Sequence, residues 1–127
     1  MKKLLTLLLS LIISQATLAQ STTDQVKQAL NAGSAKELTK YFNKITELKI
    51  NDKGANYSQI QSESILKDFF QKNPPINFDY IHKGSSPEGL KYNIGMYNAK
   101  SNTYRVVILM KEVGDKYVVD TINFNID

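Results

Sequence analysis

Five side chains that could take part in acid–base chemistry are predicted to share one face of a β-sheet. Residues of alternating polarity fill the C-terminal half, and the apolar-rich face of these segments carries Tyr80, His82, Tyr92, Tyr104 and Asp120. A carboxylate on an apolar face costs free energy unless it is paired or protonated. The five residues therefore predict a polar cluster that lines a ligand pocket.

Two interpretations of this cluster stay open. In one, Asp120 or His82 is a general base and a tyrosine such as Tyr92 is the proton donor, which is the chemistry of an isomerase or a dehydratase. In the other, the same groups form a structural hydrogen-bond network or bind a ligand without reacting. We favour the second, because a lone histidine at a strand end is more often a hydrogen-bonded residue than a base.

The composition excludes several other kinds of site. The chain has 127 residues, no cysteine and one histidine. Disulfides, cysteine-ligated zinc, iron–sulfur clusters, thiol nucleophiles and multi-histidine metal sites are therefore impossible. The glycines do not have the spacing of phosphate-binding loops, and no serine lies in a G-x-S-x-G motif. We expect neither a metal nor a cofactor.

Residues 1–19 have the pattern of an export signal. Lys2 and Lys3 precede a largely apolar region of ten residues, and Thr17 and Ala19 supply small side chains before a predicted cleavage after Ala19. The apolar run is too short to span a membrane, so we expect a secreted or periplasmic protein without a membrane span. The two lysines also account for part of the formal net charge of +4. The other lysines are interleaved with acidic residues, which argues against a nucleic-acid partner.

The remaining residues, 20–127, predict one α+β domain with a helix–helix–strand–strand–helix order followed by four strands. Capping residues and apolar spacing of about 3.6 indicate three helices: Thr22 or Thr23 can cap the first, and Ser58 with Gln61 can form a capping box at the start of the third. Short turns between alternating segments indicate antiparallel strands, so the helices should pack on one face of a curved sheet. The predicted helices are 22–32, 34 to about 43, and 58–73; the predicted strands are 47–50, 55–57, 76–84, 90–99, 103–113 and 116–126.

The alternation of polar and apolar residues also predicts which side chains face the core and which face away from it. Besides the polar cluster, we expect Ile94, Met96 and Val118 to point toward the helices. The opposite face should be an interaction surface for a partner, such as an envelope protein or a second copy of this chain. That outer surface is predicted to contain Arg105, Tyr97, Val107, Leu109 and Val119.

The element order and several runs of sequence resemble a known superfamily. The domain is similar to the cone-shaped, cystatin-like fold of nuclear transport factor two, ketosteroid isomerase and limonene-epoxide hydrolase. Within that superfamily it resembles a small secreted bacterial family of unknown function. The resemblance rests on Ser34–Phe42, Ile65–Pro75, the pair His82 and Gly84, Tyr92–Gly95 and Tyr104–Val106.

This resemblance implies an architecture and leaves the activity open. In ketosteroid isomerase, a carboxylate base and a tyrosine hydroxyl transfer a proton in the cone pocket. The acid and the tyrosines of this chain correspond to that pair only in general location, and fold does not determine function. The prediction is therefore an exported, non-catalytic module that binds a small ligand or a protein, with the isomerase or dehydratase as the alternative.

Overall fold

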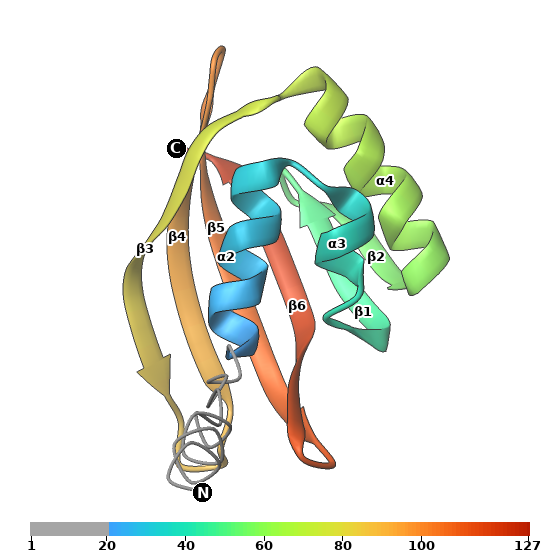
Figure 1. Ribbon diagram of the computed structural model, residues 1–127, viewed down its shortest axis with the longest axis vertical. Helices are drawn as coiled ribbons and strands as arrows, with labels where there is room; N and C mark the ends of the chain where they lie inside the picture. Colours follow the sequence, from blue (N-terminus) through green and yellow to red (C-terminus); the bar gives the residue numbers. More distant parts are fainter. Residues whose placement is uncertain (1–20) are drawn as a thin grey trace, which may run out of the picture.

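The computed structural model describes residues 21–127 as three helices on a six-stranded sheet (Figure 1). The predicted export signal, residues 1–19, lies outside the described residues. None of the helices in residues 21–127 has the length and apolarity needed to cross a membrane. The helices are α2 (Thr22–Ala32), α3 (Ala35–Thr39) and α4 (Gln59–Lys72); the strands are β1 (Phe42–Ile50), β2 (Lys53–Ser58), β3 (Pro75–Ser85), β4 (Lys91–Ala99), β5 (Thr103–Val113) and β6 (Lys116–Ile126).

Capping side chains fix the ends of the two long helices. The Ser21 hydroxyl accepts a hydrogen bond from the backbone N–H of Asp24, so the cap of α2 is Ser21 rather than the predicted Thr22 or Thr23. Gly33 ends this helix at φ 62, a left-handed conformation that glycine adopts readily. The predicted capping box of Ser58 and Gln61 opens α4.

Helix α3 is shorter than the prediction, which continued it to about Asn43. It stops at Thr39, and Phe42 already belongs to β1. Phe42 pairs with Val119 of β6, and the Val119 N–H donates to the carbonyl of Tyr41 at 2.8 Å. The side chain of Phe42 is buried in the core in this extended form. Tertiary pairing and burial thus outweigh the local helix pattern.

The strand order in the sheet is β2-β1-β6-β5-β4-β3, so the last strand in the sequence lies near the middle. The prediction of an antiparallel sheet is confirmed except for one pair, because β1 runs parallel to β6. Asn51 and Asp52 turn the chain between β1 and β2 with φ values of 52 and 64. Two positive φ values are typical of the tight turns that match the twist of a hairpin.

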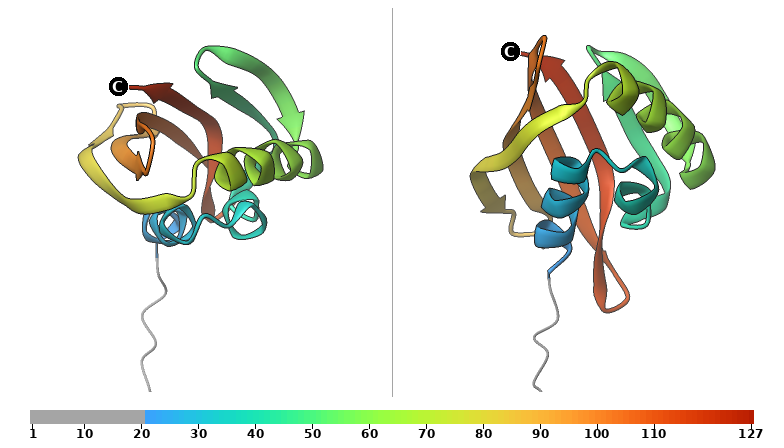
Figure 2. Two further views of the ribbon diagram at one scale, coloured as in Figure 1. Left: turned by 90° about the horizontal axis from the view of Figure 1, so that it is seen from above. Right: turned by 45° about the horizontal axis from the view of Figure 1, so that its top comes forward.

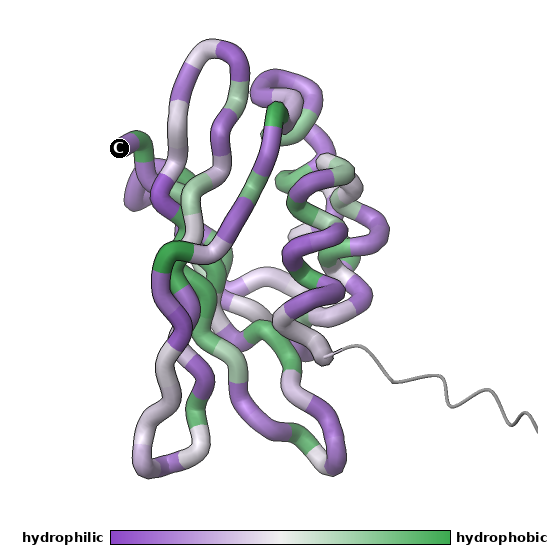
Figure 3. The backbone as a smooth tube through the Cα atoms, turned by 60° about the vertical axis from the view of Figure 1, so that its left-hand side comes forward, coloured by the Kyte–Doolittle hydropathy of each residue, from purple (hydrophilic) through white to green (hydrophobic). Residues whose placement is uncertain are grey.

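The sheet curls around the helices, which all lie on its inner face (Figure 2). The side view of Figure 3 shows the helices on one side of the sheet, and within residues 21–127 no helix covers the other side. The core fills the space between the two layers. Its largest fully buried side chains are Tyr97, Phe78, Phe124, Leu30, Leu38, Leu48, Leu66, Ile108, Met110 and Ile122.

Gly95 of β4 leaves room for the ring of Phe78 in this core. A Cβ atom built on Gly95 would lie 2.3 Å from Cζ of Phe78 and 2.8 Å from the carbonyl oxygen of Asp79. Phe78 is 2% exposed, and its ring makes an edge contact with Tyr80 at 5.1 Å. The aromatic ring therefore covers the backbone of the neighbouring strand at a position where only glycine leaves room.

We predict that Gly95→Ala lowers the free energy of unfolding by about 1 to 3 kcal/mol, the usual cost of overpacking a filled core. Urea denaturation of the variant and the wild type measures this difference. The matched control is the same change in a Phe78→Leu background, where the shorter side chain should reduce the cost. An equal cost in both backgrounds would contradict the proposed role of the ring.

Candidate functional site

The five residues predicted to line one pocket do not meet in the structure. Tyr80 and Tyr104 point into the space between sheet and helices, whereas His82, Tyr92 and Asp120 lie on the outer face of the sheet. The predicted orientation of β4 is reversed, because Asn93, Gly95, Tyr97 and Ala99 are buried. Its more apolar side chains, Tyr92, Ile94 and Met96, face outward.

Asp120 occupies a β-bulge, which explains why it leaves the core. Leu109 pairs with Thr121 and Met110 pairs with Val119, so Asp120 is an extra residue between the two pairs. Its carboxylate lies 3.6 Å from the ammonium group of Lys111 and accepts a hydrogen bond from Asn43 Nδ2 at 3.3 Å. The bulge also makes Val119 the buried residue in place of the predicted Val118. Asp120 is a paired surface carboxylate rather than part of a pocket.

A second bulge separates His82 from Tyr80. Tyr80 pairs with Gly95 and His82 pairs with Ile94, which leaves Ile81 as the extra residue of β3. His82 is exposed, and its ring makes an edge contact with Tyr92 at 6.1 Å on the open sheet face. The candidate base and donor thus lie side by side, but on a surface rather than in a cavity.

Tyr80 ties the sheet to the first helix. Its hydroxyl donates to the carbonyl oxygen of Thr23 in α2 at 2.7 Å. Burial, with a smaller contribution from the charge of Asp24, raises the pKa of Tyr80 above its usual value. The hydroxyl therefore remains a proton donor to the backbone, which is a structural role.

The outer face differs from its predicted composition in two residues. Arg105, Val107 and Leu109 point outward, and Arg105 lies 3.6 Å from the carboxylate of Asp127. Tyr97 and Val119 were also predicted there, but both are fully buried in the core. The register places Tyr92 opposite Leu109 and Ile94 opposite Val107. We call the resulting apolar surface the outer patch; it consists of Tyr92, Ile94, Met96, Val107 and Leu109.

A groove of about 520 Å³ lies between α4, the end of β1 and the start of β5. Phe69 and Tyr104 are both largely buried in its wall, with their rings in edge contact at 5.0 Å. The groove is lined by Ile50, Asn51, Ser64, Ile65, Asp68, Phe69, Lys72, Asn73 and Tyr104.

Asn73 connects the groove to the core. Its backbone carbonyl accepts a hydrogen bond from the Tyr97 hydroxyl, and its Oδ1 accepts one from the Tyr104 hydroxyl at 3.2 Å. Its Nδ2 donates to the carbonyl of Phe69 at 3.2 Å. Sequence reasoning treated Asn73 only as the end of a helix. The signal that could have singled it out is an asparagine between that helix and Pro74–Pro75, where its side chain can reach unpaired carbonyl groups.

The two charged side chains of the groove, Asp68 and Lys72, are paired with each other at 2.9 Å. The other polar groups are amides and hydroxyls, which accept and donate hydrogen bonds without charge. Within residues 21–127, no group of three histidine or carboxylate side chains could hold a metal ion.

We predict that Tyr97→Phe lowers the free energy of unfolding by about 1 to 3 kcal/mol at pH 7, because it leaves the partly buried carbonyl of Asn73 without its donor. Burial, followed by the effect of Tyr104, raises the pKa of Tyr97. In the unfolded chain a tyrosine ionises near pH 10, so this group's contribution is complete below that pH and declines above it. The stability difference between wild type and Tyr97→Phe should therefore narrow above about pH 10.

Urea denaturation at several pH values measures this difference. The control is Tyr104→Phe, which deletes a hydroxyl with a longer hydrogen bond at the rim of the same core and should cost less at pH 7. A difference for Tyr97→Phe that stays constant through pH 11 would count against this account, since about pH 10 is where the unfolded tyrosine ionises.

Comparison with solved structures places this arrangement among cone-shaped folds. A DUF4783 family protein from Bacteroides ovatus has 25% identity and a TM-score of 0.77, over 81% of this chain and 93% of that one. A domain of unknown function with a cystatin-like fold from Nostoc punctiforme has 8% identity and a TM-score of 0.66, over 84% and 73%. An NTF-2-like protein of unknown function from Silicibacter pomeroyi has 7% identity and a TM-score of 0.61, over 84% and 90%.

These likenesses confirm the predicted α+β fold with its nuclear-transport-factor-two-like and cystatin-like neighbours. No curated protein matches the sequence. The family model of DUF4783, a domain of unknown function, matches residues 23–125, which are nearly all of the residues that the structure describes. The chain therefore belongs to the DUF4783 family.

Proposed function

We propose that this protein is an exported, non-catalytic module that binds a small, uncharged and largely apolar molecule in the groove beside α4. The observation that carries the proposal is the lining of that groove. Ile50, Ile65 and Phe69 offer apolar surface, and the amides of Asn51 and Asn73 lie beside it. Binding sites for small molecules commonly combine an apolar wall with a few polar groups that fix orientation.

The polar groups of the groove are held in place before any ligand arrives. Asn73 is fixed by its bonds to Phe69, Tyr97 and Tyr104. Asn51 is fixed at the hairpin turn, because its Oδ1 accepts a hydrogen bond from the Ile126 N–H at 3.0 Å and its own N–H donates to Phe124. Preorganised partners lose little conformational freedom on binding, which favours affinity.

The charge of the groove supports a neutral ligand. Asp68 and Lys72 cancel each other's charge, and both are largely exposed at the rim. An isolated charge on the ligand would face the apolar side chains of Ile65 and Phe69 without a free partner of opposite sign. The export part of the proposal rests on the sequence pattern of residues 1–19.

We predict that Ser64→Trp blocks the groove and weakens binding of the neutral dye Nile red at least about tenfold, because a filled pocket loses its apolar contacts. Ser64 is an exposed residue of α4 that lines the groove, so the change leaves the core intact. Fluorescence titration measures the dissociation constant of the dye.

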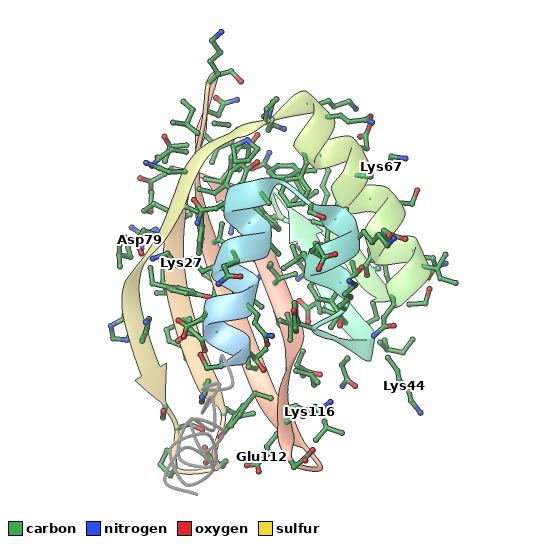
Figure 4. All side chains as sticks on the ribbon, viewed as in Figure 1. Lys27, Lys44, Lys67, Asp79, Glu112 and Lys116 are labelled. Atoms are coloured by element: carbon green, nitrogen blue, oxygen red, sulfur yellow. The ribbon has the colours of Figure 1, made fainter. Side chains whose placement is uncertain are left out.

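The matched control is Lys67→Trp on the same helix. Lys67 does not line the groove, and its side chain points away from the sheet (Figure 4). This variant should bind the dye as the wild type does. Equal weakening by both tryptophans, or no saturable binding to the wild type, would contradict the proposed use of the groove.

A second candidate function, association through the outer patch, is supported by the five apolar side chains of that surface. The occupant we propose is a second copy of this chain. The charged side chains around the patch are already paired within one molecule: Glu47 with Lys49, Arg105 with Asp127, and Lys111 with Asp120. Two copies of such a face can therefore meet without repulsion between like charges.

We predict that the wild type forms a dimer in sedimentation equilibrium and that Val107→Lys is monomeric, because an unpaired ammonium group in the centre of the patch would be buried on association. Gln28→Lys adds the same charge on exposed α2 and should leave the dimer unchanged. A wild type that stays monomeric at every concentration measured would overturn the proposal of a homodimer.

A further inference from the structure

A second pocket, of about 320 Å³, lies at the opposite end of the helical layer from the groove. It is formed by the first turn of α2, the end of β3 and the start of β4. These segments lie together at the lower end of the molecule in Figure 1. Every lining residue is polar or glycine: Ser21, Thr23, Asp24, Lys83, Gly84, Ser85, Lys91 and Asn93.

The pocket carries an excess of positive charge. Lys83 and Lys91 both line it, and neither forms an ion pair with any other residue of 21–127. Their ammonium groups instead lie 5.2 Å from the ring centre of Tyr80 and 4.2 Å from that of Tyr117. Asp24 is the single carboxylate of the lining and is exposed. Two ammonium groups against one carboxylate favour an anion.

The start of α2 adds further donors to the same place. This helix has eleven residues, and its Thr23 lines the pocket. The first backbone N–H groups of a helix lack acceptors within the helix and carry partial positive charge. Ser21 caps the N–H of Asp24 and accepts from Gln25 through its carbonyl. Within residues 21–127 the N–H groups of Thr22 and Thr23 have no acceptor.

Asn93 adds a neutral amide to the lining of the pocket. The residue is 2% exposed, and it lines the pocket from the buried face of β4. Its Nδ2 donates to Thr23 Oγ1 at 3.5 Å, the limit of a hydrogen bond, and its Oδ1 accepts none from residues 21–127. A bound polar group can exchange hydrogen bonds with this amide, since rotation of the carboxamide presents either an acceptor or a donor.

We propose that this pocket binds a small oxyanion, the carboxylate, sulfate or phosphate group of a polar molecule, between Lys83, Lys91 and Asn93. Thr23 and the start of α2 complete the set of donors. The proposed ligand differs from that of the groove in charge and in place, so the two proposals can fail independently. The negative charge of Asp24 limits the affinity for an anion. Removing this charge should therefore strengthen binding, whereas removing a lysine should weaken it.

The experiment is an NMR titration of the ¹⁵N-labelled protein with sodium acetate and with sodium sulfate, at constant pH and with sodium chloride holding the ionic strength constant. Saturable shifts of the Asn93 side-chain amide and the Thr23 backbone amide are expected. Acetate probes a planar carboxylate, and sulfate probes a tetrahedral group; the tighter of the two identifies the kind of oxyanion. Shifts that never saturate with either salt would overturn the proposal.

Two variants with opposite expected effects sharpen the result. Lys91→Met keeps the aliphatic stem on Tyr117 and removes the charge, so binding should weaken at least about tenfold. Asp24→Asn should tighten binding, because it removes the only negative charge of the lining. Lys67→Met removes an exposed lysine of α4 outside the pocket and should leave the affinity unchanged.

Equal weakening by Lys67→Met and Lys91→Met would show that only the overall charge attracts the ion, and this would overturn the site. Binding that is unchanged both in Asp24→Asn and in Lys91→Met would also overturn the site. Circular dichroism of each variant, recorded at the temperature of the titration, shows whether the fold is intact. Asn93→Leu, which keeps the volume of the side chain but not its amide, should abolish the saturable shift of Thr23.

Discussion

The sheet of this protein can surround its helices only because it bends, and the bends come from extra residues in three strands. Ile81 is extra in β3, Asp120 is extra in β6, and the register of β1 against β6 shifts between Phe42 and Glu47. A bulge increases local twist and turns the strand away from the plane of the sheet. Without these residues a flat sheet would leave the core residues of α2 and α4 only partly covered.

The same bulges determine which polar side chains lie on each face of the sheet. One extra residue moves every later side chain of a strand to the other face, and this is why Asp120 leaves the core and Val119 enters it. Asp120, the carboxylate that suggested proton transfer, therefore does not lie in the interior. The interior does contain tyrosine hydroxyls that donate to backbone or amide groups and so tie the sheet to the helices. Polar groups open to a ligand are found instead at the two ends of the helical layer.

Much of the fold, but little of the candidate site, could be predicted from the sequence. The spans of β5, β6, α2 and α4 follow from capping residues, short turns and alternation, which are local signals. The faces of β4 could not be predicted in the same way, because apolarity is a poor guide where both faces of a strand carry large side chains. In β4 the buried face contains Asn93 and Gly95, while the exposed face contains Ile94 and Met96. Gly95 is buried because Phe78 covers it, a contact between strands that no single segment reveals.

The position of β6 has a consequence for when this chain can fold. Thr46 of β1 donates to the carbonyl of Val119 of β6, although the two residues are 73 positions apart. Until β6 has been synthesised, β1 has no strand partner other than β2, and the β1–β2 hairpin is separated from the strands β3, β4 and β5. Closing so long a loop also carries an entropic cost before any contact is gained. The nascent polypeptide therefore cannot complete its sheet until β6 is available to join β1 to β5.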